Sequence, residues 1–175
     1  MRRGAWIWPL VLVLPVVPFA NSFWLRWQAA CTDPTLAWPV GAVSNYTIRD
    51  DTAGSGHFGH SRNGPRTHNG IDLAARIGTE VHAAGSGTAI LKHEPRGMGR
   101  YIELYHADGL VSVYGHLHKQ LVKDGAWVNR GEVIGQVGKS GNAGSSRMQP
   151  HIHYELRLSG VPVDPMGGYL EGTDA

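Results

Sequence analysis

From residue 79 onward, the sequence is a series of short apolar runs separated by connections that contain glycine. The runs have the length of β-strands and are rich in Val, Ile, Leu and Tyr, and none continues as a 3.6-residue apolar period. Glycine accounts for 24 of the 175 residues, about twice its average frequency of ~7 %. Because each glycine costs a helix ~1 kcal/mol relative to alanine, this pattern disfavours a helical bundle and favours a turn-rich β fold.

Six runs are predicted to form strands, at residues 79–84, 87–92, 100–106, 110–114, 132–137 and 151–158. Residues 107–109 and residues 129–131 each end in glycine and are predicted to form hairpin turns. Connections this short join antiparallel strands, since parallel strands need a crossover of a dozen or more residues. The sequence therefore predicts an all-β fold in which the sheet is mainly antiparallel.

The N-terminal 30 residues differ in kind from the rest of the chain. They hold three arginines and no acidic residue, and residues 4–25 are uncharged and largely apolar, which is typical of a secretory signal or a signal anchor helix. Pro9, Pro15 and Pro18 favour a cleaved signal peptide. An apolar stretch at residues 5–25, with tryptophans at both ends, favours a retained anchor in the inner membrane. A buried N-terminal helix is the third alternative.

The remaining chain divides into three parts by composition. Residues 31–61 are predicted to form an irregular linker or wrap-around segment, residues 62–165 the main domain, and residues 166–175 a tail. The formal charge of the whole chain is only +2, which does not suggest a nucleic-acid partner. With an export segment at its start, the protein is expected in the periplasm or cell envelope.

Histidine is the residue type that points to chemistry, with ten copies beside a single cysteine. Three groups have suggestive spacing: His68 with Asp72, His116 with His118, and His151 with His153. Residues i and i+2 of a strand share a face, so an H-x-H pair can present both rings together. Two imidazoles and a carboxylate suit zinc, and three protein ligands leave a fourth position for water, as in catalytic sites. Any single H-x-H pair can equally be two ordinary surface histidines.

Four segments together resemble the lysostaphin-type, or LytM-like, metallopeptidases, the M23 peptidase family. HNGID at residues 68–72 is similar to their H-x-G-x-D signature, and the Gly-Thr and Ala-Ala-Gly of their next hairpin follow it. The other three segments occur in the family order and read YGHLH at residues 114–118, VNRGEVIGQVGKSGNAG at residues 128–144 and PHIHYEL at residues 150–156. One departure is SSRMQ at residues 145–149, where the family often has Ser-Thr-Gly.

The resemblance implies a small, β-sandwich-like domain with an open groove. It also implies that His68, Asp72 and His153 ligate Zn²⁺, with His116 and His151 beside the metal. His118 stands where the family more often has a small polar residue and is expected to pack at the surface. The other five histidines are expected to be structural or solvated, namely His57, His60, His82, His93 and His106.

The mechanism expected from this resemblance is hydrolysis of a peptide bond. Zinc can lower the pKa of a bound water to about 7. Of His116 and His151, one would act as general base and the other would donate to the developing oxyanion. We therefore expect an exported zinc endopeptidase that cuts stem peptides or cross-bridges of bacterial peptidoglycan. The alternatives are a non-catalytic LytM-like module that activates other cell-wall hydrolases, and a zinc-buffering protein.

Overall fold

A computed structural model describes residues 35–42, 44–62 and 65–173 of the chain. The predicted signal or anchor, residues 1–30, lies outside these residues. The described part consists of β-strands and two short 3-10 turns, and none of its helices is long and apolar enough to cross a membrane. The strands are β1 (Asp50–Asp51), β2 (Gly54–Ser55), β3 (Ile71–Ala74), β4 (Glu80–His82), β5 (Gly87–Glu94), β6 (Gly99–Tyr105), β7 (Leu110–Leu117), β8 (Lys119–Gln120), β9 (Trp127–Val128), β10 (Val133–Gln136), β11 (His151–Leu158) and β12 (Val161–Val163).

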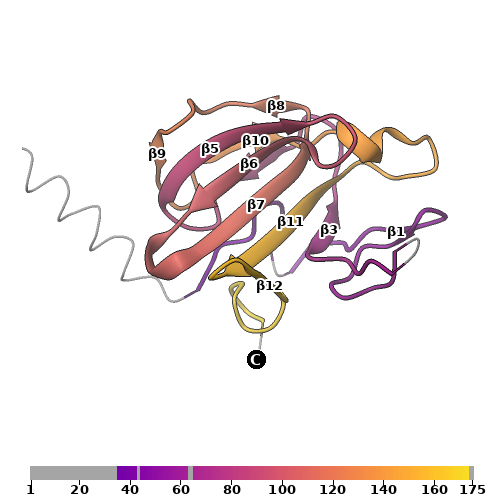
Figure 1. Ribbon diagram of the computed structural model, residues 1–175, viewed down its shortest axis with the longest axis horizontal. Coiled ribbons are helices and arrows are strands. Elements are labelled where there is room, and N and C mark those ends of the chain that lie inside the picture. The colour runs from indigo at the N-terminus through magenta and orange to yellow at the C-terminus, as the bar shows by residue number, and fades with distance from the viewer. Residues whose placement is uncertain (1–34, 43, 63–64, 174–175) are drawn as a thin grey trace, which may run out of the picture.

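The main sheet has seven strands and is antiparallel throughout. Six of them follow the order β12-β11-β7-β6-β5-β9, and β3 also pairs with β11. A smaller antiparallel sheet has the order β4-β10-β8, and its strand β8 lies along the upper edge of the molecule in Figure 1. The apolar core includes residues of both sheets, among them Ile102, Ile152, Val81 and Ile134. The predicted all-β, sandwich-like fold is confirmed.

All six predicted strands are present, with bounds shifted by a few residues at most. The hairpin predicted at residues 107–109 joins the paired strands β6 and β7, and Gly109 has the positive φ of 75° that the turn requires. The hairpin predicted at residues 129–131 is wrong. The strands on either side of that turn, β9 and β10, do not pair with each other, because β9 adds to β5 in the main sheet while β10 joins the smaller sheet.

Strand β11 has one face in the apolar core and one polar face. Ile152, Tyr154 and Leu156 point into the apolar core, whereas the intervening residues His153 and Glu155 point to the opposite face. The neighbouring strand β3 alternates in the same way, with Ile71 and Leu73 in the core and Asp72 outside it. One face of the main sheet is therefore free to carry polar groups.

The segment before the main domain, predicted to be a linker or wrap-around, packs against the sheets where it is described. Leu36, Trp38 and Val40 are buried in the core. Leu36 also forms a bridge with Leu170, a buried residue of the predicted tail. Both ends of the described chain thus cover the same part of the core.

Candidate metal centre

Three side chains converge on the open face of the sheet at β3 and β11. Asp72 on β3 lies directly opposite His153 on β11 in the strand register. His68 precedes β3, and Gly70 lets this segment pass close to β11, since a Cβ at Gly70 would lie 2.3 Å from the carbonyl oxygen of Tyr154. The glycine of the H-x-G-x-D motif is thus required by the close approach of two backbones, and it brings His68 and Asp72 to one point.

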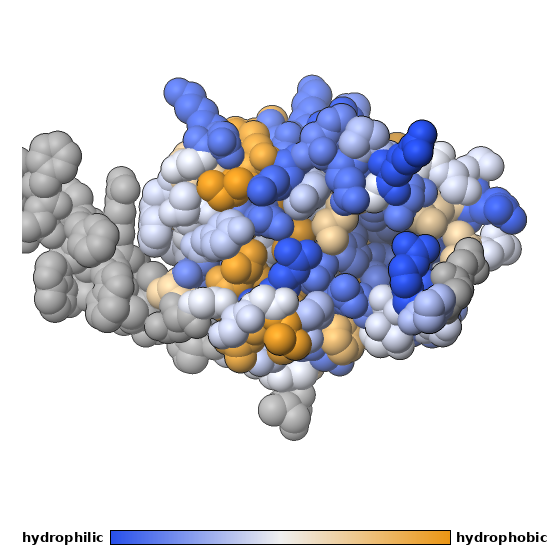
Figure 2. Space-filling view, in the orientation of Figure 1, coloured by the Kyte–Doolittle hydropathy of each residue, from blue (hydrophilic) through white to orange (hydrophobic). Residues whose placement is uncertain are grey.

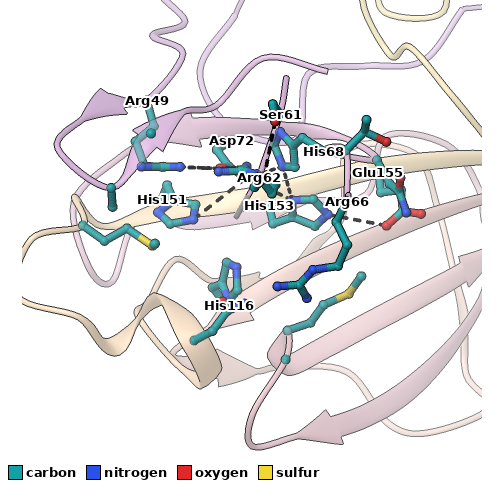
Figure 3. Close-up of a pocket in the computed structure, with 18 of the residues that line it drawn as sticks. Arg49, Ser61, Arg62, Arg66, His68, Asp72, His116, His151, His153 and Glu155 are labelled. Carbon is teal, nitrogen blue, oxygen red and sulfur yellow. Dashed lines mark hydrogen bonds and ion pairs between the residues drawn. The ribbon is translucent and has the colours of Figure 1, made fainter. Parts of the chain in front are cut away.

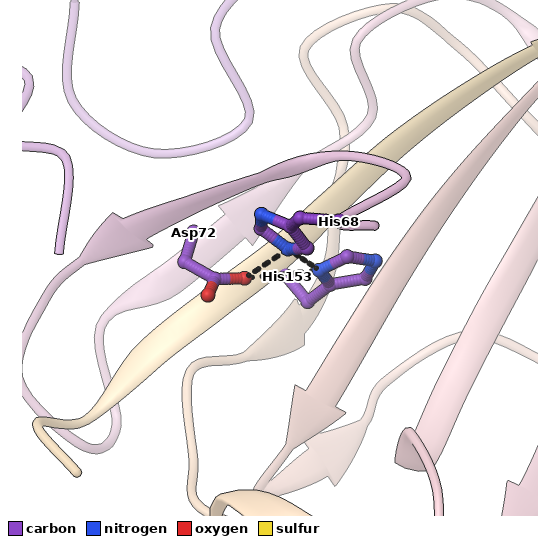
Figure 4. A group of neighbouring side chains, drawn as sticks. All are labelled: His68, Asp72 and His153. Atoms are coloured by element: carbon purple, nitrogen blue, oxygen red, sulfur yellow. Dashed lines mark hydrogen bonds and ion pairs between the residues drawn. The ribbon is translucent and has the colours of Figure 1, made fainter. Parts of the chain in front are cut away.

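His68, Asp72 and His153 place one atom each within hydrogen-bonding distance of the other two (Figure 4). Nε2 of His68 is 3.1 Å from Oδ1 of Asp72 and 3.0 Å from Nδ1 of His153, and that Nδ1 is 2.9 Å from Oδ1. A tetrahedral zinc ion with bonds of about 2.0–2.1 Å separates its ligand atoms by about 3.3 Å. The spacing and chemistry of these three buried groups therefore fit a zinc ion.

The outer nitrogen of each ring in this group faces a hydrogen-bond acceptor. Nδ1 of His68 donates to the carbonyl oxygen of His57 at 2.9 Å, and Nε2 of His153 lies 3.5 Å from a carboxylate oxygen of Glu155. A proton held on the outer nitrogen leaves the lone pair of the inner nitrogen directed at the centre. The surroundings of both histidines thus favour the tautomer that a metal ligand needs.

Without a metal, a proton takes the place of the cation at His153. Burial lowers the pKa of His153, but its contacts with Asp72 and Glu155 outweigh burial and raise it to about 9. Burial also raises the pKa of Asp72, yet the hydrogen bond from His153 and the positive charge of that ring hold it well below its usual range. The three side chains therefore attract a positive charge, which is a proton when no metal ion is bound.

The second oxygen of Asp72 is held by two arginines (Figure 3). Arg49, fully buried, donates to Oδ2 from Nε at 3.2 Å and from Nη2 at 3.0 Å, and Arg62 donates to the same oxygen at 2.9 Å. Arg49 also donates to Asp51 at 2.7 Å. The carboxylate is thus fixed in orientation, with Oδ1 facing His68 and His153.

His116 and His151 lie beside this group, with ring centroids 5.0 Å apart. Each ring donates from Nδ1 to a backbone carbonyl, His116 to Ser140 at 3.0 Å and His151 to Gln149 at 2.6 Å. Burial is the main cause that lowers the pKa of both His116 and His151, and it lowers the pKa of His116 to about 3. Both rings are therefore neutral at pH 7, with the Nε2 lone pair available to accept a proton.

His116 also has an unusual backbone conformation, with φ of 62°. Left-handed φ values are uncommon in residues other than glycine, and when found they concentrate at functional sites. The backbone is held there by hydrogen bonds from His116 N to the carbonyl of Met98 and from Ser140 N to the carbonyl of His116. This fixed turn holds the imidazole ring in place beside His151.

The five histidine and aspartate side chains line an open groove of about 660 Å³. Its other lining residues come from the segment around β1 and β2, from residues 61–62 and 66–69, from residues 94–98, from the loop that contains Asn142 and Met148, and from Glu155 on β11. The surface on the β1 side of the molecule is mostly hydrophilic or neutral in Figure 2. A groove of this polarity suits a peptide more than an apolar ligand.

All five predicted site residues thus lie in one groove, while the other histidines lie elsewhere. His118 is exposed and does not line the groove. His106 bonds the backbone of Ser86 and the hydroxyl of Ser112, which is a structural arrangement. Sequence reasoning missed Arg49, Arg62 and Glu155. Of these, only Glu155 carried a usable signal, because it stands two residues after His153 on a predicted strand.

Known proteins resemble this chain in sequence and in fold. The family model described as "Peptidase family M23" matches residues 66–165. An uncharacterized metalloprotease of Haemophilus influenzae is 36 % identical over 138 residues, which make up 75 % of this chain and 28 % of that protein. The DD-carboxypeptidase/endopeptidase Mpg of Neisseria meningitidis is 41 % identical over 101 residues, or 58 % of this chain and 22 % of Mpg. The chain thus corresponds to about a quarter of the length of these relatives.

A solved structure of a zinc-containing peptidase from Vibrio cholerae has the same fold. It superposes with a TM-score of 0.64 at 32 % sequence identity, and the match covers 78 % of this chain and 40 % of that one. The matched range of the family model contains both the H-x-G-x-D and the H-x-H motif. The chain belongs to peptidase family M23.

Proposed function

We propose that this protein is a zinc-dependent endopeptidase that hydrolyses peptide cross-links of bacterial peptidoglycan outside the cytoplasm. The observation that carries the proposal is the convergence of Nε2 of His68, Oδ1 of Asp72 and Nδ1 of His153 beside two neutral histidines in an open groove. The name of another relative, the peptidoglycan DD-endopeptidase ShyA of Vibrio cholerae, supports the class of substrate. Export is inferred from the N-terminal sequence alone.

Zinc held by His68, Asp72 and His153 would act as a Lewis acid and make water a stronger nucleophile. The rest of the chemistry is the transfer of a proton from the attacking water to the leaving amine. The neutral side chains of His116 and His151 can both carry that proton, and they differ in their surroundings.

His151 is the stronger candidate for general base. Its Nε2 lies 3.9 Å from Oδ1 of Asp72, whereas no described carboxylate comes within ion-pair distance of His116. A carboxylate nearby stabilises the imidazolium that forms when the base accepts a proton. His116, whose neutral ring is fixed by its hydrogen bond to Ser140, would then accept a hydrogen bond from the attacking water at Nε2 and so orient it.

The test is release of peptide fragments from purified peptidoglycan sacculi by the full-length, zinc-loaded protein. His151→Ala should lower the release rate at least about 100-fold, the usual contribution of a general base, with zinc content unchanged at about one ion per chain. His118→Ala is the matched control, because His118 is exposed and outside the groove. Equal rates for the wild type and His151→Ala would refute the role of His151.

Metal content separates this proposal from its alternatives. A wild-type protein that binds zinc but releases nothing from sacculi or soluble cross-linked peptides would be a binding module or a zinc buffer. A purified protein that binds no zinc would overturn the enzyme proposal itself.

A further inference from the structure

Arg66 occupies an unusual place at the groove. It lies two residues before His68, on a segment that folds back on itself through an antiparallel bridge between Ser61 and Thr67. The backbone oxygen of Arg66 accepts from Arg62 N at 2.9 Å, and His68 N donates to the carbonyl of His60 at 3.0 Å. The backbone of Arg66 is therefore fixed relative to the metal centre, although its side chain is exposed.

Three arginines line the groove, and two of them are already paired. Arg49 and Arg62 both bind Asp72, whereas the Arg66 guanidinium makes no hydrogen bond or ion pair with any residue that the structure describes. Figure 3 shows the Arg66 side chain pointing into the groove, toward the side on which His116 lies. The groove thus contains a cation that has no partner among the described residues.

The acidic residues that line the groove do not neutralise this cation. Asp72 is paired with two other arginines, and Glu155 is paired with Arg157 at 2.8 Å. Glu94 also lines the groove but does not come within 4.0 Å of the Arg66 guanidinium. A guanidinium presents two parallel N–H groups that match a carboxylate, so an anionic group of the substrate is the natural partner for Arg66.

We propose that Arg66 is a specificity-determining residue that binds a carboxylate of the peptide substrate near the scissile bond. This inference rests on the proposed function, because it places a peptide across the groove. Two sources offer the same chemistry, namely the C-terminal carboxylate of a stem peptide and the side-chain carboxylate of a dicarboxylic diamino acid within it. In both cases a peptide whose carboxylate is free is a better substrate than one in which it is amidated.

The experiment compares three synthetic peptides that carry the same scissile bond. One has both carboxylates free, one is amidated at the C-terminus, and one is amidated at the side chain. Values of kcat/KM are measured for the wild type, Arg66→Gln and Arg66→Lys, with Arg76→Gln as a control for the charge change, because Arg76 is exposed and does not line the groove. Calorimetry with His151→Ala, alone and combined with Arg66→Gln, gives the Kd of each peptide without turnover.

Arg66→Gln should lower kcat/KM for the free peptide about tenfold, as expected for the loss of a charged hydrogen bond, and should raise Kd by a similar factor. The kcat/KM of Arg66→Lys should lie between those of the wild type and Arg66→Gln. The carboxylate that Arg66 binds is the one whose amidation makes a peptide insensitive to Arg66→Gln. Zinc content and the rate with Arg76→Gln should not change. If Arg66→Gln affects all three peptides equally, or none, the inference is wrong even though the enzyme is active. If the wild type cleaves no peptide, the proposed function fails, and the Kd values still decide whether Arg66 selects carboxylates.

Discussion

Replacing Arg49 by methionine removes the buried cation that holds Asp72 while keeping an apolar stem of similar length. The side chain of Arg49 is fully buried, and those of its partners Asp72 and Asp51 are only 3 % and 9 % exposed. Removing one partner of a buried ion pair costs about 3–5 kcal/mol. Because Asp72 retains Arg62 and Asp51 still accepts from two backbone N–H groups, we expect the lower value, about 3 kcal/mol.

The loss is measured as the change in the free energy of unfolding in urea, followed by tryptophan fluorescence, on metal-free protein. Arg62→Met is the matched control, because the Arg62 side chain is 23 % exposed and Asp72 keeps both hydrogen bonds from Arg49, so we expect a smaller loss than for Arg49→Met. With zinc bound, the Arg49→Met loss should be smaller, since the cation also compensates Asp72. Equal losses for Arg49→Met and Arg62→Met would refute the view that burial makes the Arg49 pair the stronger.

Four further predictions concern β11 and the centre. Gly70→Ala should lower the unfolding free energy by about 2–3 kcal/mol, because the added Cβ would meet the rigid backbone of Tyr154. Gly144→Ala is the control and should change the unfolding free energy by less than about 1 kcal/mol, since the nearest neighbour of its Cβ would lie at 3.6 Å. Similar losses for the two variants in thermal denaturation would contradict this. Tyr154→Phe should raise stability by about 1 kcal/mol, since the buried hydroxyl has no partner among the described residues, and a clear loss would show that it has one. In metal-free protein, the protonated form of His153 stabilises the fold, fully below the usual pKa of 6.5, and this contribution is lost as the pH rises through about 9. The free energy of unfolding should therefore fall between these two pH values. Zinc affinity should rise over the same interval, which titration calorimetry can check. Glu155→Gln should weaken zinc binding about tenfold in chelator competition, because Glu155 faces the outer nitrogen of His153, and unchanged affinity would exclude that role.

The strands could be predicted from local patterns, and the five site residues from the resemblance of four segments to the motifs of a known family. The two-residue period of a strand places His151 and His153 away from the core residues Ile152 and Tyr154, and this needs no knowledge of the neighbouring strands. The fold and the family resemblance follow from the same segments.

What the sequence could not reveal are contacts between distant segments. Arg49 comes from a stretch without apolar periodicity, and its partner Asp72 is 23 residues away. The turn at residues 129–131 has the composition of a hairpin, yet the chain uses it to pass from one sheet to the other. Local turn chemistry fixes the reversal of the chain but not which strands pair on either side of it.

The two arginines on Asp72 also bear on which metals the centre can accept. Calcium takes about six to eight oxygen ligands and often binds a carboxylate through both oxygens. Here Oδ2 is engaged by Arg49 and Arg62, so a cation meets a single carboxylate oxygen and the nitrogens of His68 and His153. Because the guanidinium groups hold one oxygen, only the other is free to bind a metal ion, and we expect the centre to disfavour calcium relative to zinc.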